Sequence, residues 1–227
     1  MEKYVAIAID GPAAAGKSTV AKLVAKALNM TYIDTGAMYR AVTWATINAG
    51  LDPKNEEDAK TLLPGLKIDL MEDGGVFCNG NDVTKIIREP IVSGNVSYIA
   101  AMKSVRLALI DMQRELAKSK SVVMDGRDIG SYVLPDAEVK IFQIASVETR
   151  AQRRFIENQS KGIDTTYEEV EEEVRKRDYI DSHRDFDPLV AAEDSIEIDT
   201  SFMTIQEVVD AILKVVKEKT GLEPQCH

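Results

Sequence analysis

The stretch that decides the fold is Gly11-Pro12-Ala13-Ala14-Ala15-Gly16-Lys17-Ser18, a G-x-x-x-x-G-K-S phosphate-binding loop. It follows a short apolar run at 4–9 and precedes residues 20–28, whose apolar side chains recur at helical spacing. Glycines let backbone N–H groups wrap a phosphate, and the start of the following helix adds partial positive charge. We therefore predict that residues 11–19, including Thr19, bind a nucleoside triphosphate. Lys17 would reach the β- and γ-phosphates, and Ser18 would ligate Mg²⁺.

Outward from this loop, strands alternate with helices, which predicts an α/β fold with a parallel sheet covered on both faces. The expected strands are 4–9, 32–33, 121–125, 138–144 and 195–199, and the expected helices are 20–28, 37–49, 104–118, 146–159, 166–184 and 204–219. Residues 64–95 break the alternation, because alternating apolar residues are interrupted there by Asp73-Gly74-Gly75 and Asn79-Gly80. These are hairpin signals, and they predict a small β-rich insertion.

Composition narrows the classes of protein. A chain of 227 residues and 25.1 kDa fits one domain. The net charge of −10 argues against general nucleic-acid binding. No window approaches the ~18 apolar residues of a membrane span, and the N-terminus is too short for a signal peptide. Two distant cysteines, Cys78 and Cys226, favour a reducing cytoplasm over a disulfide scaffold.

The arginines are unevenly distributed. Six of the eleven fall between Arg150 and Arg184. In an acidic chain, such a concentration favours a local anion site. Arg177, Asp181 and Arg184 share one helix face, where they form either a surface salt-bridge ladder or, with Arg150, Arg153 and Arg154 on the preceding helix, a lid over phosphates.

Polar residues also follow two expected strands, at the edge where ligands collect in such sheets. After the second strand, Thr35 and Arg40 are candidate phosphate ligands beside Tyr39, although a helix cap with a solvated arginine explains them equally well. After strand 121–125, Asp125 is a candidate Mg²⁺ ligand, Arg127 a phosphate ligand and Asp128 a partner for a polar edge of the acceptor. The alternative there is a turn with an internal Asp–Arg pair.

Together these segments resemble the bacterial cytidylate kinases, a family of nucleoside monophosphate kinases. The resemblance covers essentially the whole chain. Besides the phosphate loop it rests on DTGAMYR at 34–40, GRD at 126–128, PDA at 135–137 with KIF at 140–142, and R-D-x-x-D-x-x-R at 177–184. It implies a five-stranded parallel core (1–63, 96–149 and 188–227), an enlarged monophosphate-binding insertion (64–95) and a helical lid (150–187), all within a single kinase domain.

The resemblance also implies roles for individual residues. Thr35, Arg40, Arg127 and Arg184 would grip the acceptor's phosphate, with Tyr39 beside it. Ser97, Arg106 and Asp128 would read the cytosine ring, and Arg177 and Asp181 would hold the ribose hydroxyls. We expect the catalytic cations to be Lys17, Arg127, Arg154 and Arg184, and the metal ligands to be Ser18 and Asp125. The chain departs from the family pattern at Thr35, where many relatives have Ser, and at Ser18, where some have Gly.

The expected activity is transfer of the γ-phosphoryl group of ATP to CMP or dCMP, with Mg²⁺ as cofactor. The alternatives are a phosphate-loop kinase of another acceptor, such as UMP, and a nucleotide-binding switch that transfers nothing. The sequence contains no Asn-Lys-x-Asp element for guanine recognition, which is evidence against the switch interpretation. We expect a cytoplasmic monomer whose partners are ATP and CMP or dCMP, with neither nucleic acid nor membrane among them.

Overall fold

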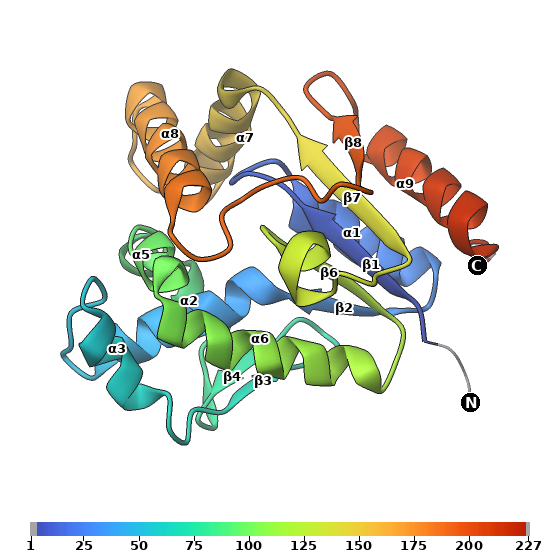
Figure 1. Cartoon of the computed structure of the whole chain (residues 1–227). Coiled ribbons are helices and arrows are strands. Elements are labelled where there is room, and N and C mark those ends of the chain that lie inside the picture. Colours follow the sequence, from blue (N-terminus) through green and yellow to red (C-terminus); the bar gives the residue numbers. More distant parts are fainter. Residues whose placement is uncertain (1–3, 226–227) are drawn as a thin grey trace.

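The computed structural model describes residues 4–225, and its centre is a five-stranded sheet in the order β2-β6-β1-β7-β8 (Figure 1). Every neighbouring pair of strands in it is parallel. The strands are β1 (Ala6–Asp10), β2 (Thr31–Asp34), β6 (Val122–Gly126), β7 (Val139–Ile144) and β8 (Ile196–Asp199). The predicted five-stranded parallel α/β core is therefore confirmed.

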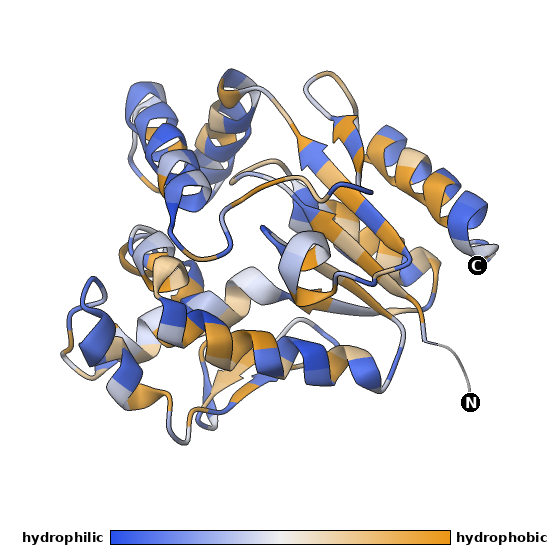
Figure 2. Cartoon of the chain, viewed as in Figure 1, coloured by the Kyte–Doolittle hydropathy of each residue, from blue (hydrophilic) through white to orange (hydrophobic). Residues whose placement is uncertain are grey.

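Helices cover both faces of this sheet, because successive side chains of a buried strand point to opposite sides. Ile7 and Ile9 of β1 pack in one apolar cluster with α1 (Lys17–Ala27) and α9 (Ile205–Thr220). Ala8, between them, belongs to a second cluster with α6 (Lys103–Lys118) and the π-helical turn η2 (Ile129–Val133). In Figure 2 the largely apolar strands of the sheet lie next to the amphipathic helix α9.

A third cluster lies beside the sheet, where α2 (Thr35–Asn48) and α6 pack against the segment between them. That segment contains α3 (Glu56–Leu62), the antiparallel strands β3 (Ile68–Leu70), β4 (Val76–Cys78) and β5 (Asn81–Asp82), the 3₁₀ turn η1 (Ile86–Arg88), α4 (Pro90–Ser93) and α5 (Val96–Ala101). The hairpin expected from the glycine pairs is present, but residues 86–88 and 90–93 form two short helices. Pro90 at the first position of α4 starts a helix and disfavours a strand. Cys78 is a buried free thiol, and Cys226 lies outside the described residues.

The helices α7 (Val147–Ser160) and α8 (Tyr167–His183) lie side by side at one end of the molecule (Figure 1). Both begin where the sequence predicts. Ser146 caps α7, and Thr166 forms a reciprocal capping box with Glu169 at the start of α8. Figure 2 shows α8 as largely hydrophilic, so packing fixes it less firmly than it fixes the helices on the sheet.

The carboxyl ends of three neighbouring strands meet at one edge of the sheet. Ile9 of β1 and Asp34 of β2 both stand in register with Asp125 of β6. The phosphate loop, the segment that starts α2 and the Gly126-Arg127-Asp128 turn therefore leave the sheet together, which is where a ligand site forms in this class of fold. Within residues 4–225, no helix combines the length and the apolar character needed to cross a membrane.

Candidate active site

The phosphate loop is shaped by its glycines and closed by Lys17. Gly16 has a left-handed backbone with φ 88° and precedes α1 directly. Gly11 has φ 148°, and a Cβ there would lie 2.0 Å from the Gln143 carbonyl oxygen, so no larger residue fits. The buried Lys17 ammonium donates to the Gly11 and Pro12 carbonyls, each at 2.7 Å. Burial, reinforced by the positive charge of Arg127, lowers the pKa of Lys17 well below its usual value.

At the foot of this loop, Ser18 and Asp125 form the pair predicted to bind the metal. The Ser18 hydroxyl donates to one Asp125 oxygen at 2.8 Å, and the Tyr32 hydroxyl donates to the other at 2.7 Å. Burial raises the pKa of Asp125, and the nearby charge of Asp34 adds to the effect. A hydroxyl and a carboxylate are the hard oxygen ligands that Mg²⁺ prefers, so both side chains fit such an ion.

The start of α2 combines a helix cap with an arginine cluster. Asp34 accepts the backbone N–H of Ala37 at 2.7 Å and forms ion pairs with Arg40 at 3.3 Å and Arg88 at 2.7 Å. Burial disfavours the Asp34 carboxylate, but the two arginines hold its pKa below its usual value. Burial also lowers the pKa of Arg40, to about 10. The Thr35 hydroxyl donates to the Asp125 backbone carbonyl at 2.7 Å, which ties α2 to β6.

Asp128 bridges two buried arginines from distant parts of the chain. One of its oxygens pairs with Arg106 of α6, and the other accepts from Arg184, just after α8, at 3.2 Å. Arg106 also donates to the Tyr39 hydroxyl at 3.3 Å and is fully buried. Asp128 thus pairs across the fold and not with its neighbour Arg127. Arg184 also donates to the carbonyls of Asp187 and Ala100 at 2.6 and 3.4 Å, so its predicted phosphate role requires a change of partners.

Arg127 forms its ion pair with α8 instead. Its Nε donates to Asp181 at 2.8 Å, and this contact contributes to holding the pKa of Asp181 low against the opposing effect of burial. Arg177, one helical turn before Asp181, has a pKa lowered by burial and by the charge of Arg127. The three residues therefore lie together, on the side of α8 that faces the turn after β6.

Two of the three arginines of α7 bind backbone carbonyls outside their own helix, and the third, Arg154, does not. Arg150 is buried, pairs with Asp178 of α8 at 2.7 Å and donates to the Ala13 carbonyl at 3.1 Å, so it joins α7, α8 and the phosphate loop. Arg153 donates to the carbonyls of Ala15 and Thr200 at 3.3 and 2.6 Å. Arg154 pairs only weakly, at 3.4 Å, with Glu157 on its own helix.

These residues enclose a cavity of about 900 Å³. It brings together Lys17, Ser18, Asp125 and all ten predicted acceptor ligands, Ser97 included. Eight of the chain's eleven arginines line it: Arg40, Arg88, Arg106, Arg127, Arg153, Arg154, Arg177 and Arg184. Thr200 and Met203, which precede α9, also line it.

The cavity also collects the unpaired polar atoms of the protein. Seven buried side-chain nitrogen or oxygen atoms in residues 4–225 have no hydrogen-bond partner, and six of them belong to residues that line it. They are the Nε atoms of Arg40, Arg106 and Arg177, both amide atoms of Gln113 and the Oε1 of Gln143. Because buried polar atoms are normally paired, this concentration marks a site that a polar ligand completes.

Several residues of the site have no recognisable sequence signal. Arg88 comes from the irregular segment before α4, Gln113 from the middle of α6, and Tyr32 from a strand. Asp10 differs from these three, because its position at the end of β1, directly before the phosphate loop, is a sequence signal that could have identified it. Its carboxylate accepts the backbone N–H groups of Ile129 and Gly130 at 2.8 and 2.7 Å, and so fixes the turn that carries Asp128.

Asp10 gives the protein a pH-dependent component of stability. Burial raises its pKa from 3.8 to about 7, although the two backbone N–H donors and the charge of Lys17 lower it. Between these pH values the folded state binds the proton and the unfolded state does not, so the free energy of unfolding falls as pH rises. Asp10→Asn lacks this titration. We expect the variant to gain stability relative to the natural protein across the interval, measured by urea unfolding at successive pH values.

The exposed Asp136→Asn is the control for this measurement, because its stability should track that of the natural protein. A difference between Asp10→Asn and the natural protein that stays constant with pH would contradict the assigned titration.

The sequence comparisons with known proteins agree on one family. Residues 7–218 match the family model described as cytidylate kinase. A cytidylate kinase of Ligilactobacillus salivarius is 53% identical over 222 residues, which are 96% of this chain and 99% of the relative. One of Bacillus cereus is 51% identical over 219 residues, 95% and 97% of the two chains. Among solved structures, an uncharacterized protein from Eubacterium ventriosum aligns with a TM-score of 0.52 at 15% identity, over 95% of this chain and 99% of that one, a likeness of fold alone.

Proposed function

Because the chain belongs to the cytidylate kinase family, we propose that it transfers the γ-phosphoryl group of ATP to CMP or dCMP, giving ADP and CDP or dCDP. The observation that carries the proposal is the charge distribution. A protein with a net charge of −10 places eight of its eleven arginines, together with Lys17, around one cavity. Two nucleotides that react through their phosphates carry the negative charge that such a lining complements.

The phosphate loop supplies the donor side. We assign the phosphates of ATP to residues 11–19, where the start of α1 presents backbone N–H groups and Lys17 can exchange its carbonyl partners for the β- and γ-phosphates. A kinase of this kind uses a divalent metal, which neutralises charge on the transferring phosphate, and we propose Mg²⁺. Ser18 and Asp125 would hold it. No group of three or more His, Cys, Asp or Glu side chains in residues 4–225 is placed to bind a metal. Nucleotide oxygens would supply further ligands to the ion.

The opposite end of the cavity supplies the acceptor side. We assign the acceptor's phosphate to Thr35, Arg40 and Arg127, with Arg184 joining when it releases Asp128. The cytosine ring lies against Tyr39, Ser97, Arg106 and Asp128, and the ribose hydroxyls meet Arg177 and Asp181. The unpaired Nε atoms of Arg40, Arg106 and Arg177 support this assignment, because each belongs to a residue in one of these three groups.

No side chain needs to act as nucleophile, since an oxygen of the acceptor's phosphate attacks the γ-phosphorus directly. The protein's contribution is to position both nucleotides and to stabilise charge through Lys17 and the arginines, including Arg154. Excluding water matters for the same reason, because water in the site would compete with the acceptor.

A panel of acceptors tests this function. In a coupled assay of ADP release, we expect CMP and dCMP to support turnover well above UMP, AMP and GMP. Faster turnover with UMP or with a small metabolite would identify a kinase of another acceptor. If the rate of ADP release were the same with and without each acceptor, the result would instead favour the nucleotide-binding switch.

Residues 150–187, the predicted lid, are expected to change their motion when nucleotides bind. Arg154 and Arg177 line the cavity without a strong partner, and they gain partners only when both nucleotides are bound. We expect hydrogen exchange in residues 150–187 to slow when ATP and CMP are added together, and to change less with either alone. The last turns of α9, residues 212–220, do not line the cavity and serve as the internal reference. Equal exchange with and without both nucleotides would mean that these arginines form only a salt-bridged surface.

A further inference from the structure

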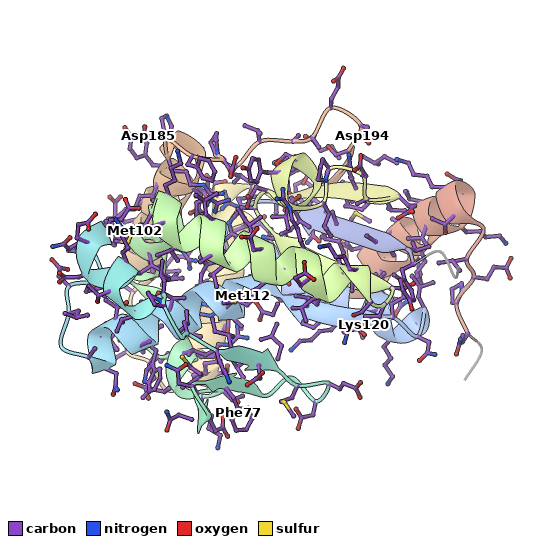
Figure 3. All side chains as sticks on the ribbon, turned by 60° about the horizontal axis from the view of Figure 1, so that its bottom comes forward. Phe77, Met102, Met112, Lys120, Asp185 and Asp194 are labelled. Atoms are coloured by element: carbon purple, nitrogen blue, oxygen red, sulfur yellow. The ribbon has the colours of Figure 1, made fainter. Side chains whose placement is uncertain are left out.

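Gln113 lines the cavity but has been given no role in binding so far. Gln113 lies on α6 seven residues after Arg106, so both side chains share one face of the helix. Figure 3 labels the neighbouring Met112, near the middle of this helix. Gln113 is 1% exposed, yet it borders the cavity together with Tyr39, Arg106 and Ile129.

The amide of Gln113 lacks hydrogen bonds at both ends. Neither Nε2 nor Oε1 has a partner, although both are buried. Gln113 lies close enough to Tyr39 to oppose the rise that burial causes in the pKa of the Tyr39 hydroxyl. No hydrogen bond joins the two side chains, however, and the Tyr39 hydroxyl accepts from Arg106. The other cavity residues with unpaired atoms each retain an interaction or a role. Gln143, for example, donates its Nε2 to the Ala15 carbonyl.

Packing alone does not account for a glutamine at this place. Leu109 and Ile110, one helical turn earlier, place apolar side chains in the two neighbouring apolar clusters. An apolar residue at position 113 would fill the same space without the free-energy cost of burying an amide that has no hydrogen bonds. A fully buried amide kept without partners is rare in proteins and indicates a ligand that supplies them.

We propose that Gln113 binds the acceptor, its amide pairing with the polar edge of the nucleobase next to Arg106 and Asp128. The inference rests on the proposed function and adds a residue to the same site. An amide offers one acceptor oxygen and two donor hydrogens, which match the amino group of cytosine and its ring acceptors. Because an amide can turn to present either end, it also serves uracil. Gln113 therefore contributes affinity for a pyrimidine, and Asp128 contributes the choice between pyrimidines.

Two apolar replacements of similar size, Gln113→Met and Gln113→Leu, test the proposal. We expect the KM for CMP to rise about tenfold, the factor that corresponds to about 1.4 kcal/mol. The KM for ATP and the ratio of CMP to UMP activity should stay unchanged. The melting temperature of the free protein should hold or rise, because the variants remove an unpaired amide, while the stabilisation by added CMP should shrink.

Ser104→Ala is the matched control. Of the seven buried unpaired side-chain atoms in residues 4–225, the Ser104 hydroxyl oxygen is the one whose residue does not line the cavity, and it lies on the same helix as Gln113. The KM of Ser104→Ala for CMP should stay unchanged. The proposal is overturned if the Gln113 variants keep the natural KM for CMP. It is also overturned if they lose folding, or if the two KM values rise together with a fall in melting temperature, since Gln113 would then be structural. A natural protein inactive on CMP would refute the proposed function itself.

Discussion

Replacing Lys17 by alanine is expected to lower kcat by a factor of ~10²–10³ or more, the effect of losing one preorganised charge contact to the transition state. Lys17 is buried and bound only to two carbonyls of its own loop, so its ammonium can move to the phosphates without breaking an ion pair. Burial already lowers its pKa, which means that the folded protein holds this charge at a cost. Removing it should therefore leave the fold and the circular dichroism spectrum unchanged.

Lys26→Ala, in the last turn of the same helix, is the matched control, because that side chain is exposed and lies outside the cavity. It should keep the natural kcat. If Lys17→Ala kept it too, the phosphate loop would not be the catalytic site.

Replacing Asp128 by asparagine is expected to lower kcat/KM for CMP by ~10-fold or more, on the scale of an unsatisfied buried group. A carboxylate only accepts hydrogen bonds, so it favours the amino group of cytosine over the carbonyl of uracil at the same position. Asparagine can turn its amide toward that carbonyl. The ratio of CMP to UMP activity should therefore narrow as well.

Stability must be separated from recognition in this variant. Asp128 compensates the buried charges of Arg106 and Arg184, and breaking a buried pair costs about 3–5 kcal/mol of stability in other proteins. A loss of stability lowers activity on both acceptors alike, so the ratio of the two activities is the decisive measurement. Asp136→Asn, exposed and outside the cavity, controls for the charge change. An unchanged ratio in Asp128→Asn would leave Asp128 with a structural role only.

The sequence predicted the core of the fold well because local patterns determine it. The apolar run before Gly11 and the period of residues 20–28 specify a strand, a phosphate loop and a helix without reference to the rest of the chain. The glycine pairs likewise predicted the hairpin of β3 and β4. The 86–93 segment was wrongly assigned to the β-rich part, since its helices are too short to show a period.

The charge pairing could not be predicted, because it joins residues that only the folded chain brings together. Asp128 meets Arg106 and Arg184 across 22 and 56 residues, and Arg88 reaches Asp34 across 54. The spacing of Arg177, Asp181 and Arg184 predicted one helix face, which is wrong for Arg184, because α8 ends at His183 and Arg184 has an extended backbone. Nor did the spacing predict that Asp181 would pair with Arg127. Gln113 carries no motif at all, and only its burial without partners draws attention to it.

Phosphoryl transfer from ATP to CMP is tested most directly by following the transferred phosphorus. The protein is mixed with CMP, Mg²⁺ and ATP labelled in the γ-phosphate, and the products are separated. We expect the label to appear in CDP, with little released as inorganic phosphate and none transferred when CMP is omitted. Label released mainly as inorganic phosphate, whether or not CMP is present, would contradict phosphoryl transfer to CMP.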